Sequence, residues 1–190
     1  MTKPKFCLKQ TCLAIIVLVT ALLTLNWKAN ACSVTVNPHL TIDTGKSHTI
    51  VDSAKFSIEV PDGWDRFNKT SQGFNILFLM APRADNFASN INILLEDIKG
   101  MPVDEYLKIS IENIQKAGMV KDGSGDFDAS NCHGTYITSS MDYNGISCAL
   151  KSYVFIKDGT AYVVTGTCLA SQKDKFRQIF DDAVKTLKIK

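Results

Sequence analysis

Two turn dipeptides in the last third of the chain constrain its fold more than any other feature. Asn144-Gly145 and Asp158-Gly159 each separate two runs of residues that favour extended structure. Asn-Gly and Asp-Gly between such runs are strong signals for hairpin turns. The stretch 132–168 is therefore predicted to form a three-stranded antiparallel meander, and the rest of the chain is predicted to cover the sheet that this meander defines.

The N-terminal 31 residues have the pattern of a targeting signal. Three lysines precede an apolar run of 13 residues at 13–25, and Ala29 and Ala31 then form an A-x-A cleavage pattern. The run matches the hydrophobic region of a signal peptide and is shorter than the roughly 20 residues that cross a bilayer as a helix. We expect residues 1–31 to be a removed signal peptide, with a retained anchor helix as the alternative.

Cleavage after Ala31 would leave Cys32 at the mature N-terminus. A cysteine directly after a small residue is the position that bacterial lipoprotein processing acylates, and a lipid chain there would tether the domain to a membrane surface. Ala29 and Asn30 depart from the residues usual before such a cysteine, so lipidation of Cys32 and simple secretion both stay open. The expected location is the bacterial envelope, either in the periplasm or anchored to a membrane through Cys32.

The charge balance gives no reason to expect a nucleic-acid partner. The formal net charge is +2, but residues 1–31 contain four lysines and no acidic residue. The remainder holds 17 basic and 19 acidic residues and is close to neutral. This near-neutral balance gives no reason to expect nucleic-acid binding, which needs a clustered basic face.

Cys132, Cys148 and Cys168 lie in the predicted meander, and export would bring them to an oxidising compartment. A two-residue turn at Asp158-Gly159 would pair Cys148 with Leu169 and leave Cys168 on the opposite face. A three-residue loop with a left-handed glycine would shift the register by one and place Cys148 opposite Cys168. We expect this second register with a Cys148–Cys168 disulfide, and two free buried thiols are the alternative.

Periodicity predicts the remaining elements and the domain limits. The expected elements are strands at 55–60, 74–80 and 90–98, a helix at 102–118, a linker at 121–129, the meander, and a final helix with Ser171 as its N-cap and an apolar stripe that ends at Leu187. Residues 32–52 are expected to be a flexible leader, and residues 53–190 the folded domain. Antiparallel hairpins with two amphipathic helices predict a layered α+β domain.

No cofactor or metal site is expected from the motifs. The histidines lack a metal-ligand spacing, and no phosphate-binding loop or dinucleotide fingerprint occurs. The acidic run at 122–128 alternates as in a calcium loop, but Phe127 and His133 occupy the positions of the required glycine and glutamate.

Cys132 and His133 are the one pair that suggests catalysis. A thiol beside an imidazole is the arrangement of a cysteine nucleophile and its base. Neighbouring residues on a strand point to opposite faces, which disfavours a direct contact between the two. A thiol-dependent enzyme that uses Cys132 and His133 therefore remains an alternative function. Cys132 is also free to pair with Cys32 if Cys32 is not acylated.

The order of motifs resembles the PsbP-like superfamily. Phe56-Ser57-Ile58-Glu59-Val60-Pro61-Asp62-Gly63-Trp64 is similar to its opening strand and P-x-G-W turn, and Asn90-Ile91-Asn92-Ile93 is similar to its next recurring strand. The 102–118 helix, the two hairpins and the 176–187 helix follow in the same order. The resemblance covers about residues 53–189.

The resemblance implies an α/β/α sandwich around a central antiparallel sheet. The superfamily also contains Mog-type Ran-binding proteins and DcrB-like secreted or lipid-anchored bacterial proteins, and the signal peptide favours the bacterial branch. Such proteins act mostly by binding, so we expect a non-enzymatic accessory protein with an unknown protein partner in the cell envelope. A carrier of a small ligand, held between sheet and helix, is a further alternative.

Overall fold

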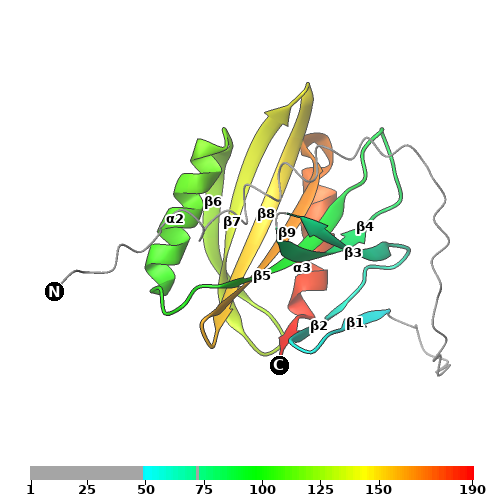
Figure 1. Ribbon diagram of the computed structural model, residues 1–190. Helices are drawn as coiled ribbons and strands as arrows, with labels where there is room; N and C mark the ends of the chain where they lie inside the picture. Colours follow the sequence, from blue (N-terminus) through cyan, green and yellow to red (C-terminus); the bar gives the residue numbers. More distant parts are fainter. Residues whose placement is uncertain (1–48, 72) are drawn as a thin grey trace.

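The computed structural model describes residues 49–71 and 73–190 (Figure 1). The predicted signal peptide, Cys32 and most of the predicted leader lie outside the described residues. The last residues of the predicted leader form a strand, because β1 (Ile50–Asp52) makes an antiparallel ladder with β2 (Phe56–Glu59).

The described elements follow one another in an order close to that predicted. After β1 and β2 they are β3 (Asp65–Ser71), β4 (Phe74–Met80), β5 (Asn90–Asp97), α2 (Val103–Lys116), β6 (Val120–Asp128), β7 (His133–Tyr143), β8 (Ile146–Lys157), β9 (Thr160–Leu169), a 3-10 turn (Ala170–Gln172), α3 (Lys173–Lys185) and β10 (Lys188–Ile189). A seven-stranded sheet has the order β3-β4-β5-β9-β8-β7-β6, and a small second sheet has the order β1-β2-β10.

The meander is confirmed with both of its tight turns. Asn144 and Gly145 have φ of +50° and +78°, and Asp158 and Gly159 have φ of +49° and +72°. Positive φ at both central residues is the type I′ turn, whose twist matches that of the strands it joins. Tyr143 pairs with Ile146 across the first turn, so each loop has two residues. Asparagine, aspartate and glycine at these positions therefore set the register of β7, β8 and β9.

The predicted Cys148–Cys168 disulfide is wrong. Lys157 pairs with Thr160 across a two-residue turn, which places Cys148 opposite Leu169 and Cys168 opposite Ala149. Both cysteines are buried as free thiols. Cys148 packs in a cluster with Ile114 of α2, whereas Cys168 packs in the cluster that contains Phe180 of α3. The two sulfur atoms therefore lie on opposite faces of one sheet.

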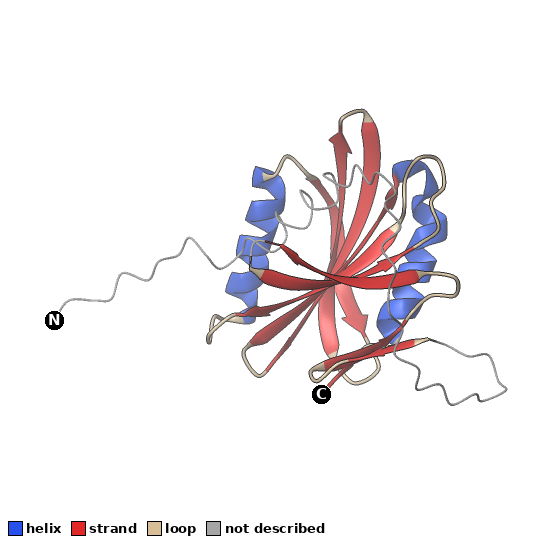
Figure 2. Ribbon diagram, turned by 45° about the vertical axis from the view of Figure 1, so that its right-hand side comes forward, coloured by secondary structure: helices blue, strands red, loops and turns tan. Residues whose placement is uncertain are grey.

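The architecture is an α/β/α sandwich around a central antiparallel sheet, as predicted. Figure 2 shows the two helices on either side of the strands. Along β8, Tyr153 and Phe155 belong to the core cluster on the α3 side, and Val154 belongs to a cluster with Tyr106 of α2. Both faces of the central strands are thus covered, and β8 and β9 are buried along most of their length.

Strand β6 replaces the predicted 121–129 linker, and the start of the last helix also differs. Two glycines and three aspartates are unfavourable in isolated strands. Pairing with β7 overrides this preference, with a register shift between Lys121 and Gly123. Strand β3 was not predicted and pairs with β4 along its whole length. Ser171 is not the N-cap, because it lies within the 3-10 turn and α3 begins at Lys173.

The Phe180 ring of helix α3 lies directly against Gly166 of β9. A Cβ atom built on Gly166 would lie 2.4 Å from two ring carbons of Phe180. The ring also stacks at a tilt on Phe176, with 5.9 Å between centroids. The missing side chain of Gly166 therefore sets how closely α3 packs on the sheet.

We predict that Gly166→Ala lowers the free energy of unfolding by about 1–3 kcal/mol, because the added methyl group overpacks this contact. Urea unfolding of the variant measures the loss. The penalty should shrink in a Phe180→Leu background, which removes the clashing ring edge. Gly123→Ala is the matched control, since its Cβ meets only the Thr138 hydroxyl at 3.2 Å. An equal loss in both single variants would contradict the proposed contact.

Candidate functional site

The structure separates the two residues of the predicted thiol–imidazole pair. Cys132 precedes β7 and is half-buried against the core cluster on the α3 side. His133 begins β7 and is exposed, and its Nδ1 lies 2.6 Å from Oδ1 of Asp128, its register partner on β6. Within residues 49–71 and 73–190, no hydrogen bond joins the Cys132 thiol to an imidazole.

The environment of Cys132 does not activate its thiol. Burial raises the pKa of Cys132, and the backbone hydrogen bond from Asn131 and the charge of Lys157 only partly offset this effect. The Asp128 carboxylate, through its hydrogen bond and its charge, raises the pKa of His133. A thiolate nucleophile needs the opposite shift at the sulfur. This geometry lacks the features that catalysis by Cys132 and His133 would need.

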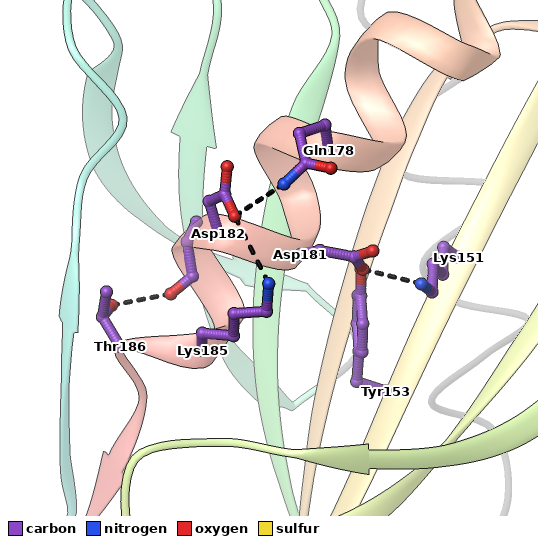
Figure 3. A network of polar contacts seen from close by, with 8 residues as sticks. Lys151, Tyr153, Gln178, Asp181, Asp182, Lys185 and Thr186 are labelled. Carbon is purple, nitrogen blue, oxygen red and sulfur yellow. Dashed lines mark hydrogen bonds and ion pairs between the residues drawn. The ribbon is translucent and has the colours of Figure 1, made fainter.

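A different polar cluster lies on the α3 side of the sheet and was not predicted. We call it the Lys151 box, and it consists of Lys151, Asp181, Tyr153, Tyr136 and Phe127. The Lys151 ammonium lies 2.6 Å from Oδ1 of Asp181, and the Tyr153 hydroxyl donates to the same oxygen at 2.5 Å (Figure 3). The ammonium also lies 4.3, 5.2 and 5.5 Å from the ring centroids of Tyr136, Tyr153 and Phe127.

Strand register and one glycine assemble this box. Tyr136 of β7 pairs with Tyr153 of β8, so both rings point to the α3 side. Gly125 of β6 is the partner of Tyr136, and a Cβ there would lie 3.0 Å from the tyrosine ring. The ring of Tyr136 therefore uses the space above Gly125. Phe127 meets Tyr153 edge-on at 4.7 Å and closes the aromatic wall.

The Lys151 box holds the charged end of Lys151 in a fixed position, and the Lys151 side chain is only 11% exposed. A buried charge is tolerated only when it is paired and hydrogen-bonded, and Asp181 with three aromatic faces supplies that environment. Burial and the hydrogen bond to Asp181 raise the pKa of Tyr153 far above that of a free tyrosine, so its hydroxyl stays a donor. Lys151, which interrupts the mostly apolar stretch 148–156, was the available sequence signal for this cluster.

A second buried polar group lies between β5 and α2. Glu96 is 4% exposed, and the Tyr106 hydroxyl of α2 donates to its Oε2 at 2.8 Å. Burial raises the pKa of Glu96, and the hydrogen bond from Tyr106 opposes this only in part. The site therefore favours the protonated carboxyl.

The other candidate sites carry little chemistry. An open groove of about 310 Å³ runs between β1 and β3, and its lining includes Asp52, Arg66 and Phe67. The acidic residues at 122–128 lie on the extended strand β6 and do not form a loop. Residues 49–71 and 73–190 contain no group of three His, Cys, Asp or Glu side chains placed to hold a metal ion.

We predict that the Lys151–Asp181 pair couples more strongly than an exposed pair on the same helix. A double-mutant cycle with Lys151→Met and Asp181→Asn should give a coupling free energy of about 1–3 kcal/mol, because each partner is held in a poorly solvated site. The control is Lys185 with Asp182, which lie 3.5 Å apart and are more than half exposed. That cycle should give less than about 1 kcal/mol. Equal coupling in the two cycles would refute a special role for the box.

Glu96 should make stability depend on pH in a definite direction. Its pKa is raised in the folded state, so its stabilising contribution is present below about pH 4.5 and is lost as the pH rises through the folded-state pKa. The difference in unfolding free energy between the native protein and Glu96→Gln should therefore decrease from pH 4 to pH 8. Urea titrations across this range measure it, with the exposed Glu105→Gln as control. A difference in unfolding free energy that does not change between pH 4 and pH 8 would contradict the conclusion that Glu96 is buried and protonated.

Known proteins resemble this chain in structure only. No protein-family model matches it, and no curated protein matches it in sequence. Cyanobacterial PsbP (CyanoP) from Synechocystis sp. PCC 6803 has a similar structure, with a TM-score of 0.57, 11% identity, and coverage of 81% of this chain and 100% of CyanoP.

Two further solved structures are similar. LpqN of Mycobacterium tuberculosis, which is involved in cell envelope biogenesis, has a TM-score of 0.54 and 15% identity. The similarity covers 77% of this chain and 87% of the LpqN chain. PA94 of Pseudomonas aeruginosa, a protein of unknown function, has a TM-score of 0.54 and 16% identity, with coverage of 73% and 94%. No helix among the described residues is long and apolar enough to cross a membrane. The chain has the PsbP-like fold that the sequence resemblance predicted.

Proposed function

We propose that this chain is an exported accessory protein of the bacterial envelope that binds a protein partner and is not an enzyme. The signal-peptide pattern supports export, and the PsbP-like fold is shared with an envelope-biogenesis protein. The proposal follows from the site rather than from the fold alone, because unrelated functions share most folds.

One observation carries the proposal: the Lys151 box holds two partly exposed aromatic rings in fixed positions near a sheet edge. Tyr136 and Phe127 are partly buried, and each ring contacts the Lys151 ammonium. Rigid aromatic side chains lose little entropy on binding and are enriched among the residues that dominate protein interfaces. Strand β6 forms the edge of the sheet beside them.

The charges around these rings indicate the chemistry of the partner. Asp122 of β6 is exposed at this sheet edge, and Lys151 is already paired with Asp181. A partner surface with basic residues around a pocket for an aromatic ring complements this edge. The thiol-dependent alternative has weaker support, since Cys132 packs on the core and His133 bonds to Asp128.

Site-specific photocrosslinking in living cells tests this proposal. A benzoylphenylalanine at position 136 should capture an envelope protein that the same residue at position 143 does not capture. Tyr143 lies on the same strand, but its side chain points to the other face because the two positions are an odd number of residues apart. The captured protein, once purified, should bind the native chain at least tenfold more tightly than it binds Tyr136→Ala.

Two outcomes would contradict the proposal. The first is equal capture of the envelope protein from positions 136 and 143. The second is an unchanged affinity of the purified partner for Tyr136→Ala. Either result would show that the Lys151 box is not part of the interface. Alkylation of Cys132 by iodoacetamide in the native protein at pH 7, at a rate equal to that of free cysteine, would favour the thiol-dependent enzyme. Its raised pKa predicts a slower rate.

A further inference from the structure

Four buried polar side chains form a compact block on the α2 side of the sheet. Asn90 and Asn92 of β5 pair with Thr167 and Thr165 of β9, so the four side chains point to one face. None of them is more than 3% exposed. We call these four residues the polar patch. Apolar side chains would bury here without penalty, so the presence of four polar groups calls for a physical explanation.

The hydrogen bonds within the structure leave most of this patch unsatisfied. Thr165 meets the Ser152 hydroxyl at 3.0 Å, and Nδ2 of Asn90 donates to the carbonyl oxygen of Ala88 at 3.2 Å. Oδ1 of Asn90, both polar side-chain atoms of Asn92 and Oγ1 of Thr167 are fully buried, and none of them has a hydrogen-bond partner among residues 49–71 and 73–190. Buried polar groups in folded proteins are almost always paired, so four such atoms on neighbouring positions point to a shared missing partner.

The chemistry of the patch defines what that partner offers. Amide and hydroxyl groups both donate and accept hydrogen bonds, and no residue of the patch carries a formal charge. Glu96, further along the same face, is occupied in part by Tyr106. A charged ligand group would lack a counter-charge in this buried setting. The complementary group is therefore uncharged and carries hydroxyl or amide functions.

A buried apolar cluster lies directly beside the patch, and Phe78 in it is 1% exposed. Asn92 pairs with Phe78 of β4, and Phe78 pairs with Phe67 of β3. One row across the sheet thus changes from hydroxyl groups at Ser152 and Thr165, through the amide of Asn92, to two aromatic rings. Phe67 and Phe78 stack with 5.2 Å between centroids, and Phe67 is 36% exposed at the sheet edge.

The apolar part of this row is buried, with Ile76, Phe78 and Leu94 at most 1% exposed. Ile76, Phe78 and Leu94 form a cluster with Phe74, and every described member of this cluster is a strand residue. The side chains of α2 belong to the two neighbouring clusters instead. Strand β3 is hydrogen-bonded within the large sheet on one side only, so the edge beside Phe67 is the least costly place for the site to open.

We propose that the polar patch and the Phe78–Phe67 row bind a small uncharged amphiphile. Its hydroxyl- or amide-bearing head bonds to Asn92, Asn90 and Thr167, and its apolar body lies across β4 and β3 toward Phe67. This site lies on the opposite face of the sheet from the Lys151 box. The two proposals can therefore fail independently.

Calorimetric titration with two matched probes tests the site. The full chain is expressed from Met1 and purified after any processing in the host cell. Each probe is then titrated into the protein at concentrations below the critical micelle concentration of that probe. The probes are 1-monolauroylglycerol, with an uncharged diol head, and laurate, with the same chain length and a carboxylate head. We expect saturable binding of the monoglyceride, and binding of laurate at least tenfold weaker.

Variants locate the head group. Asn92→Leu should weaken monolauroylglycerol binding at least tenfold while circular dichroism stays unchanged. Asn75→Leu is the matched control, because Asn75 is exposed on the neighbouring strand and points to the other face. If Asn92→Leu does not fold, Thr167→Val removes one buried hydroxyl at nearly constant shape and should weaken binding at least threefold.

Three results would overturn the proposal. One is the absence of saturable binding of either probe, which would leave the patch to buried water alone. Another is laurate binding as tight as that of the monoglyceride, since the patch offers no counter-charge. The third is unchanged monoglyceride affinity in Asn92→Leu, or in Thr167→Val where the first variant does not fold.

Discussion

The register set by two type I′ turns is the constraint on which the rest of the structure depends. Asn144-Gly145 and Asp158-Gly159 each join their strands through two residues, which fixes every pairing among β7, β8 and β9. Side chains alternate along a strand, so a slip of one residue would exchange the two faces of the sheet. In the observed register, Lys151 and Tyr153 point toward α3, and Ser152 and Thr165 point toward the α2 side.

The two faces carry different chemistry because of this register. On the α3 side, Phe180 packs on Gly166, and the polar groups of the Lys151 box satisfy one another. On the α2 side, Asn92 and its neighbours hold buried polar atoms without partners. The polar groups of the box are paired with one another, which suits a rigid surface for a protein partner. The polar patch lacks hydrogen-bond partners among the described residues, which suits a ligand site.

The fold was largely predictable, and the sites were not. Strands at 74–80 and the 102–118 helix follow from local periodicity and from the positions of Pro102 and Gly118. Strand β6 escaped prediction because Gly123, Gly125 and its aspartates favour turns, and only pairing with β7 makes it extended. The Lys151 box joins residues from three strands and a helix, and sequence spacing alone does not reveal such neighbours.

The sequence by itself determined the export signal pattern, the meander with its two turns, and the PsbP-like order of elements, because these depend on residues close together in the chain. The tertiary structure decided which side chains meet. It placed Cys148 and Cys168 on opposite faces, since the two-residue turn at Asp158-Gly159 was retained over the three-residue loop. It also brought Asp181 to Lys151, because the docking of α3 on the sheet depends on packing between distant segments.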